Sequence, residues 1–170
     1  MRLEEINITG YDTILLDRDG TINVHIIGDY VRKWEDFEFI PNVVDAIARW
    51  SQLVRHIIVV TNQRGIGKGF FSEKDLTDIH SQMVAEIAKA GGRIDGIYFC
   101  PSLTEEDIRR KPGNGMFMEI LRDFPDVDPE KTLMVGDGDV DRDFAHNCGI
   151  DFIRVDSLKR EGNKKYWINA

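Results

Sequence analysis

The chain lacks several features that would set it apart from ordinary globular proteins. Its 170 residues include only two cysteines, Cys100 and Cys148, which excludes a disulfide framework and favours a reducing compartment. No apolar run approaches the length of a membrane span. The first ten residues contain neither a basic start nor an apolar stretch, so we expect no signal peptide and a cytoplasmic protein. We find no internal repeat and no low-complexity segment.

Positive charge is also scarce. The chain has 22 Lys and Arg against 30 Asp and Glu, for a formal net charge of -8. This balance argues against binding to nucleic acid or to a membrane surface. A length of 170 residues and a hydrophobic fraction of 42% suit one globular domain. If such a chain handles phosphate, it must gather its basic residues at one place.

Apolar runs alternate with segments of helical periodicity, which predicts an α/β protein. The order of these segments implies a parallel sheet with right-handed crossovers. Strands are predicted at 14–16, 57–60, 94–100, 132–135 and 152–155, and helices at 43–50, 74–90, 116–124 and in the segment ending at 148. The basic, polar tail at 159–170 is expected to be partly disordered.

Polar side chains follow three of these strands. Asp17 and Asp19 come after the first, Thr61 and Asn62 after the second, and an acidic run beginning at Asp137 after the fourth. The carboxyl ends of parallel strands meet at one edge of the sheet, where ligands bind in open α/β folds. The sequence therefore predicts one site built from all three clusters.

The pair Asp17 and Asp19 points to metal-dependent phosphoryl transfer. Carboxylates held this close repel each other unless a cation or a proton lies between them, which suggests Mg²⁺. A strand ending in an Asp-Gly turn is the common alternative. In the catalytic interpretation Asp17 is the nucleophile that forms an aspartyl-phosphate. Asp19 is then the general acid and base.

The remaining polar residues supply the other parts of a phosphoryl-transfer site. Thr61 and the amides near Asn62 would hold phosphate oxygens, and Lys111 would neutralise charge. Asp137 and Asp141 would complete a magnesium site together with the first two carboxylates. Alone, Lys111 could be an ordinary solvated lysine and the acidic run a helix N-terminus. The convergence of the clusters favours the site.

Basic residues are concentrated in the loops beside this predicted site, namely Arg64, Lys68, Arg109, Arg110 and Lys111. Two long irregular segments accompany them: a flap at about 22–40 and a basic loop at about 100–115. His80 lies one residue from the apolar face of its helix, where a packed or exposed histidine is expected rather than a ligand.

The ordered motifs resemble those of the haloacid-dehalogenase-like (HAD) phosphatases. The matching residues are Asp17-x-Asp19-Gly20-Thr21, Thr61, Lys111-Pro112 and Gly136-Asp137-x-x-x-Asp141. The resemblance spans about residues 14–155. It implies an α/β fold with a Rossmann-like parallel sheet, helices on both faces and no large cap domain. It also implies a magnesium-dependent phosphomonoesterase that acts on a small phosphorylated metabolite.

A narrower resemblance is to the subgroup of D-glycero-D-manno-heptose 1,7-bisphosphate 7-phosphatases and histidinol-phosphatases. It is carried by residues 17–23, 37–41, 61–66, 95–101 and 110–112. The resemblance implies a heptose bisphosphate as the first choice of substrate, with Arg110 and Lys68 as substrate-binding residues. Histidinol phosphate or another sugar phosphate is the alternative, and Asp107 would suit a cationic substrate. The protein is expected to be a monomer or a weak homo-oligomer.

The chain departs from this subgroup in its zinc loop. Cys100 is present, but Ser102, Asp107 and Arg109 stand where the other ligands would be. One thiolate cannot form a closed tetrahedral site, so we expect no structural zinc. A phospho-accepting receiver module is a remote alternative, because it also combines Asp, Thr and Lys around magnesium. A regulatory protein without activity is disfavoured because every expected catalytic position is filled.

Overall fold

The computed structural model describes residues 1–170. Its strands are β1 Thr13–Leu16, β2 His25–Ile26, β3 His56–Asn62, β4 Gly96–Cys100, β5 Thr132–Gly136, β6 Asp151–Arg154, β7 Ser157–Glu161 and β8 Lys164–Ile168. Its α-helices are α1 Val43–Ser51, α2 Arg64–Gly67, α3 Glu73–Lys89, α4 Gly115–Asp123 and α5 Asp139–Cys148. Short 3-10 helices occur at Leu3–Glu5, Trp34–Asp36 and Pro129–Lys131.

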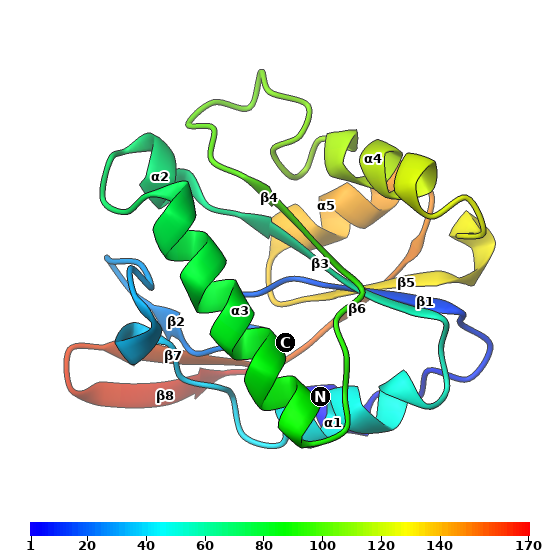
Figure 1. The fold of residues 1–170 in the computed structure, drawn as a ribbon, viewed down its shortest axis with the longest axis horizontal. Helices are drawn as coiled ribbons and strands as arrows, with labels where there is room; N and C mark the ends of the chain where they lie inside the picture. The colour runs from blue at the N-terminus through cyan, green and yellow to red at the C-terminus, as the bar shows by residue number, and fades with distance from the viewer.

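Five parallel strands form the main sheet, in the order β4-β3-β1-β5-β6 (Figure 1). β1 lies at the centre, and Leu16 is the register partner of both Val59 in β3 and Val135 in β5. This confirms the predicted Rossmann-like α/β class. The chain runs from β1 to β3 and β4 on one side, then crosses to β5 and β6 on the other. The carboxyl end of β1 therefore lies at a topological switch point, where such folds bind ligands.

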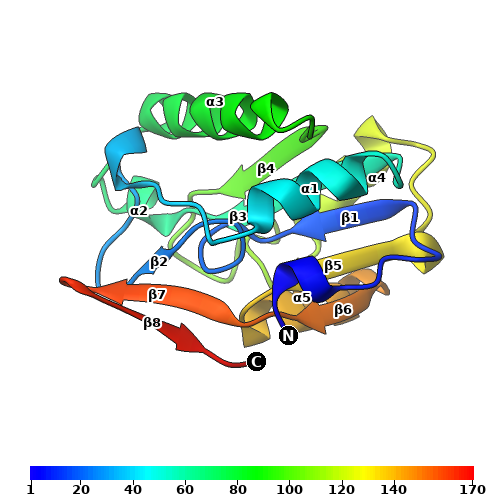
Figure 2. The same ribbon diagram turned by 90° about the horizontal axis from the view of Figure 1, so that it is seen from below.

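Helices cover both faces of the main sheet. Ile14 and Leu16 of β1 belong to the core cluster that contains the apolar residues of α1 and α3, and these two helices lie on the same side of the sheet (Figure 2). Leu15 belongs to the second cluster, with residues of α4 and α5. Because side chains alternate along a strand, the side chains of the residues that follow β1 can also point toward either face of the sheet.

A second, smaller sheet was not predicted. β7 and β8 form an antiparallel hairpin, and β7 pairs in parallel with β2 of the flap, in the order β2-β7-β8 (Figure 1). The expectation of a partly disordered tail at 159–170 is therefore wrong. The tail is ordered because Leu158 is buried in the core and the Arg2 guanidinium carbon lies 3.1 Å from the centroid of the Trp167 ring.

The flap, residues 22–40, is partly ordered by its own aromatic residues. The rings of Trp34 and Phe37 are stacked with centroids 5.0 Å apart, and Phe39 packs edge-on against Phe37 at 4.9 Å. Phe37 is buried, as are Val31 and Ile40. The flap is thus fixed to the core at several points, while β2 is fixed to the hairpin. No helix in the structure combines the length and hydropathy required for a transmembrane span.

Candidate active site

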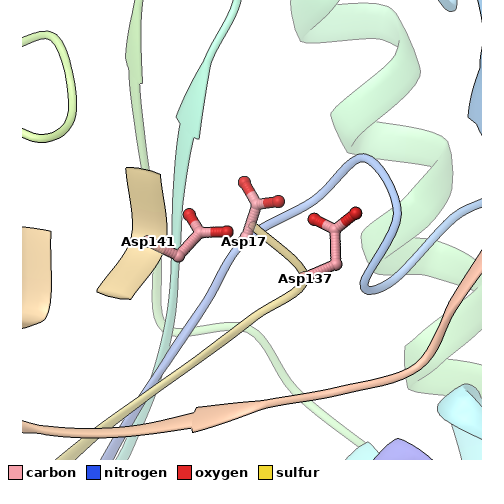
Figure 3. A group of neighbouring side chains, drawn as sticks. All are labelled: Asp17, Asp137 and Asp141. Carbon is pink, nitrogen blue, oxygen red and sulfur yellow. The ribbon is translucent and has the colours of Figure 1, made fainter. Parts of the chain in front are cut away.

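Three carboxylates converge at the carboxyl end of the main sheet. Asp17 follows β1, Asp137 follows β5 and Asp141 lies in the first turn of α5. One oxygen from each lies within 4.8 Å of the others, and Figure 3 shows the three carboxyl groups side by side. Neighbouring strands and a helix N-terminus therefore bring together residues that are far apart in the sequence.

Two glycines make this approach possible. A Cβ atom on Gly20, whose φ is +89°, would clash with the Asp137 carboxylate. A Cβ atom on Gly136 would clash with the carboxylate of Asp141. Glycine is the residue type that permits both the positive φ at position 20 and the close contacts at both positions.

Lys111 joins the triad from the loop after β4. Its Nζ donates hydrogen bonds to Asp17 Oδ1 at 2.8 Å and to Asp141 Oδ1 at 2.7 Å, and its side chain is 1% exposed. The Asn62 side chain holds the lysine backbone: Lys111 N donates to Asn62 Oδ1 at 2.9 Å, and Asn62 Nδ2 donates to Lys111 O at 2.9 Å. Asn62 thus anchors the loop that carries the lysine.

The buried carboxylates of the triad repel one another strongly. Burial, together with the neighbouring carboxylate of Asp141, raises the pKa of Asp17 well above its ordinary value. Burial and Asp141 raise the pKa of Asp137 as well. Burial alone would lower the pKa of Lys111, but the carboxylates of Asp141 and Asp17 raise it. An all-oxygen donor set with excess negative charge fits Mg²⁺.

The carboxylate of Asp19 lies outside this triad. Its Oδ1 accepts hydrogen bonds from Arg18 NH2 at 2.8 Å and from Asn23 Nδ2 at 2.9 Å, and its Oδ2 accepts one from Gln63 Nε2 at 3.0 Å. Burial opposes ionisation, yet the Arg18 guanidinium and these hydrogen bonds lower the pKa of Asp19 overall. Its role in metal binding stays a prediction, while its position suits an acid and base beside Asp17.

The sequence reasoning missed three residues that surround Asp19: Arg18, Asn23 and Gln63. Gln63 Nε2 also donates to the Thr61 hydroxyl oxygen at 2.8 Å, so it links Thr61 to Asp19. All three are buried, with exposures of 2% or less. The sequence did contain a signal, since these three polar residues lie close to the predicted catalytic residues. A buried polar side chain needs hydrogen-bond partners, and polar neighbours of this kind can supply them.

A pocket opens over these residues. Asp17, Asp19 and Asp137 line it, with Thr61, Asn62 and Lys111. Further lining residues come from the flap and the neighbouring loops, namely His25, Ile26, Asp29, Tyr30, Val31, Arg64, Arg110 and Val140. The structure therefore brings most of the predicted site residues to one cavity.

The predicted basic residues divide into two groups. Arg64 and Arg110 line the pocket, and Lys68 Nζ lies 5.6 Å from the centroid of the Tyr30 ring at its rim. Arg109 points elsewhere: it bonds to Glu119 Oε2 at 2.9 Å and to the Phe99 carbonyl at 3.0 Å. Arg109 therefore stabilises the loop, and the others supply the positive charge of the pocket.

The loop at 100–115 is held together by Asp107. Its carboxylate accepts hydrogen bonds from the Ser102 hydroxyl and from the backbone N–H of Arg109, and it lies 3.6 Å from Cys100 Sγ. These hydrogen bonds engage the acidic group that sequence reasoning had offered to a cationic substrate. They also connect the start of the loop to its middle, where Arg110 NH1 donates to the Ser102 carbonyl at 3.0 Å.

Comparisons with known proteins agree with this geometry. A family model described as polynucleotide kinase 3 phosphatase matches residues 12–157. The D-glycero-alpha-D-manno-heptose-1,7-bisphosphate 7-phosphatase of Mycobacterium bovis is 39% identical over 135 residues, covering 79% of this chain and 71% of the relative. The D-glycero-beta-D-manno-heptose-1,7-bisphosphate 7-phosphatase of Haemophilus influenzae is 37% identical over 131 residues, with 73% and 70% coverage.

A solved structure has the same fold. The D,D-heptose 1,7-bisphosphate phosphatase of B. bronchiseptica, complexed with magnesium and phosphate, superposes with a TM-score of 0.78 at 33% identity. The match covers 83% of this chain and 78% of that one. The family match at residues 12–157 includes every strand of the main sheet and all three carboxylates of the triad.

Proposed function

The chain belongs to the HAD-superfamily phosphatases, within the family that the polynucleotide kinase 3 phosphatase model describes, and from this premise we propose that it removes the 7-phosphate of a heptose 1,7-bisphosphate. It is a magnesium-dependent phosphatase. The single observation that carries the proposal is the triad of Asp17, Asp137 and Asp141 with Lys111 bridging two of its members. The heptose is favoured because the relatives at 37–39% identity carry that name.

The first chemical step is attack by Asp17 on phosphorus. Lys111 holds Oδ1 of Asp17, which leaves Oδ2 to form the new O–P bond while the bond from phosphorus to the sugar oxygen breaks. Asp19 donates a proton to the departing oxygen. The carboxylates of Asp17, Asp137 and Asp141 would hold the magnesium ion, which would supply positive charge to offset the negative charge of the phosphoryl group. The Thr61 hydroxyl and the amides near Asn62 would hold phosphate oxygens.

The second step releases phosphate. Asp19, now ionised, accepts a proton from water as the water oxygen attacks phosphorus, and the bond between phosphorus and Asp17 breaks. Inorganic phosphate leaves and Asp17 is regenerated as a carboxylate. The hydrogen bonds from Arg18, Asn23 and Gln63 stabilise the ionised form of Asp19, which is the form that this step requires, so the first step draws on the minor, protonated form.

The test of the proposal is Asp17→Asn, compared with the unaltered protein on a panel of phosphate esters with and without Mg²⁺. Asparagine keeps the shape but cannot form an acyl phosphate, so Mg²⁺-dependent release should fall by at least about a thousandfold. Circular dichroism and thermal melting verify that the fold is retained. Turnover that survives in Asp17→Asn would refute the assigned nucleophile.

The same panel identifies the substrate. It contains both anomers of heptose 1,7-bisphosphate, histidinol phosphate and a 3′-phosphorylated oligonucleotide. The two anomers are included because relatives are named for each. Histidinol phosphate is the second candidate, supported by the Asp29 carboxylate among the pocket residues. The highest kcat/KM for a bisphosphate supports the proposal, and a preference for either other compound replaces it.

A further inference from the structure

Arg18 is a fully buried cation between two parts of the molecule. Its side chain is 0% exposed, and its Nε and NH2 donate to Asp19 Oδ1 at 3.2 and 2.8 Å. On its other side, NH1 lies 3.1 Å from Nε2 of His80, which is on α3. The three side chains therefore form a continuous hydrogen-bonded series, Asp19–Arg18–His80.

Strand alternation explains why the series exists. Ile14 and Leu16 point toward the core cluster that includes α3 residues, and Arg18 is the next position with the same parity. Its guanidinium thus enters the layer between the sheet and α3, where His80 faces it. Asp17 and Asp19 have the opposite parity, and both line the pocket.

The protonation state of His80 follows from its partner. A guanidinium group has only donors, so Nε2 must accept and the imidazole proton must lie on Nδ1. Burial and the nearby Arg18 charge lower the pKa of His80 to about 3. His80 is 7% exposed, and the other charged group that acts on its pKa is Asp19, which lies beyond Arg18 and raises it. His80 is therefore a neutral acceptor for the buried arginine.

We propose that His80 is a positioning residue for catalysis, which acts through Arg18 to fix the rotamer of Asp19. The inference rests on the proposed function, because it takes Asp19 as the proton donor. Arg18 and Asn23 use Oδ1, so the carboxylate can rotate only by breaking their hydrogen bonds. Oδ2 then stays beside Gln63, free on one side to serve as the acid.

Without an acceptor at position 80, NH1 of Arg18 would be a buried donor with no partner. Burying such a group is costly, so the guanidinium would turn toward other acceptors or toward water. A groove lined by His80, Thr77, Ser81, Val84, Ile97 and Phe99 gives water a route to that position. Asp19 would then lose the group that holds its Oδ1.

The experiment compares His80→Leu, which removes the acceptor, with His80→Gln, whose Oε1 can reach the position of Nε2. Each variant is assayed with Mg²⁺ on an alkyl phosphate, the best bisphosphate of the panel, and on p-nitrophenyl phosphate. The nitrophenolate leaving group departs without a proton, whereas a sugar alkoxide needs one. kcat/KM is measured because it covers the steps up to departure of the leaving group.

In His80→Leu we expect kcat/KM on the alkyl phosphate to fall about tenfold, part of the 10²- to 10⁴-fold that a general acid contributes. kcat/KM on p-nitrophenyl phosphate should change much less, and His80→Gln should recover most of the loss. If His80→Leu does not fold, His80→Asn replaces it, because its shorter side chain does not reach Arg18.

Equal losses on both esters would overturn the inference, since a purely structural role for His80 predicts that result. Unchanged kcat/KM on both esters would overturn it as well. Failure of the proposed function is a separate result: the unaltered protein would then show no Mg²⁺-dependent hydrolysis of alkyl phosphates. Thermal melting of each variant measures the effect on stability independently of turnover.

Discussion

The two sheets of this protein contribute to the site in different ways. The five-stranded sheet is parallel, its central strands β1 and β5 are fully buried, and its carboxyl edge carries Asp17, Thr61 and Asp137. The three-stranded sheet is small, and most residues of β8 are exposed. It contributes His25 and Ile26 of β2 to the wall of the pocket. The large sheet thus positions the catalytic residues, and the small sheet positions the flap.

The difference shows how each part is stabilised. The large sheet is held by apolar burial, with Ile14, Leu15 and Leu16 all 0% exposed, and hydrophobic burial is the main driving force of folding. β2 has only two residues and depends on its pairing with β7, including the hydrogen bond from Ile27 N to Arg160 O at 2.9 Å. Local changes should therefore affect the small sheet without unfolding the large one.

Among the changes that test this comparison, the largest effect is expected at the carboxyl edge of the large sheet, from Lys111→Met. The change leaves the buried carboxylates of Asp17 and Asp141 without their cation, and activity should fall about 100- to 1000-fold. Breaking a buried pair also costs about 3–5 kcal/mol of stability in the metal-free protein. Initial rates and urea unfolding, with and without Mg²⁺, measure the two effects.

Lys159→Met is the matched control on the small sheet. Its Nζ lies 4.0 Å from Asp137 Oδ2, and the side chain is 27% exposed. Because water screens this pair, we expect a loss of less than about 1 kcal/mol in stability. Similar losses in the two lysine variants would contradict the division between the sheets.

The second prediction removes the hairpin by ending the chain at Asp156. The flap loses the partner of β2, so amide exchange at Ile27 should accelerate while β1, β3 and β5 stay protected. KM for the bisphosphate should rise more than kcat falls, because the triad residues and Lys111 are all retained, and only neighbours of Asp137 on β7, among them Lys159, are lost. Hydrogen exchange and steady-state kinetics provide the measurements.

Truncation also removes the buried Leu158, so a lower melting temperature is expected. Leu158→Ala in the full chain separates the two contributions, because it creates a cavity but keeps the pairing of β2. If the flap exchanges as slowly after truncation as before, the hairpin does not hold it.

The same contrast explains what the sequence could predict. β1, β3 and β5 of the large sheet are built on uncharged apolar runs, and each polar cluster follows one of them, so both the sheet and its catalytic edge were predictable. β7 reads Ser-Leu-Lys-Arg-Glu and β8 reads Lys-Lys-Tyr-Trp-Ile. These segments are rich in charge, and their ordered conformation depends on pairing with β2, which lies far away in the sequence.

The environment of Asp19 was missed for a related reason. The motif indicates a second carboxylate, but not which groups surround it. His80 lies on a helix that periodicity predicts well, and yet its contact with Arg18 depends on the packing of α3 against the sheet. Contacts between side chains in different layers can be identified only from the tertiary structure, whereas the ends of the strands can be predicted from the hydrophobic pattern of the sequence.

The third prediction concerns pH and metal removal. The pKa values of Asp17 and Asp137 are raised above 3.8 in the folded protein. A raised pKa means that the folded state binds more protons, so the stability contribution is present below 3.8 and is lost as pH rises through the folded value. With EDTA, the free energy of unfolding should therefore fall as the pH rises from 3.8 through the folded pKa values. Mg²⁺ should reduce the fall, because it compensates the charge that protons otherwise neutralise.

This prediction is checked by urea unfolding at a series of pH values above 4, with EDTA or with Mg²⁺. The Asp137→Asn variant is the control, because it removes one of the two raised groups. The pH dependence with EDTA should weaken in that variant. An identical pH dependence in both metal conditions would show that the triad does not bind the ion in the folded protein.

The smallest effect is expected where the flap meets the hairpin at its surface. Glu38 Oε1 lies 2.6 Å from Lys165 Nζ, and Oε2 lies 3.8 Å from Arg160 NH1. Both partners of the shorter pair are well exposed, at 39% and 48%, so Glu38→Lys should lower stability by less than about 1 kcal/mol. The loss should shrink at high salt, whereas backbone pairing of β2 with β7 should be insensitive to salt.

Glu35→Lys is the matched control for this change, because it makes the same charge change on an exposed flap residue for which no ion pair is observed. The double variant Glu38→Lys with Lys165→Glu restores opposite charges and should recover part of the loss. Thermal melting at two salt concentrations is sufficient to measure these differences. A loss in Glu38→Lys as large as that of truncation would mean that surface charge, rather than backbone pairing, holds the flap to the hairpin.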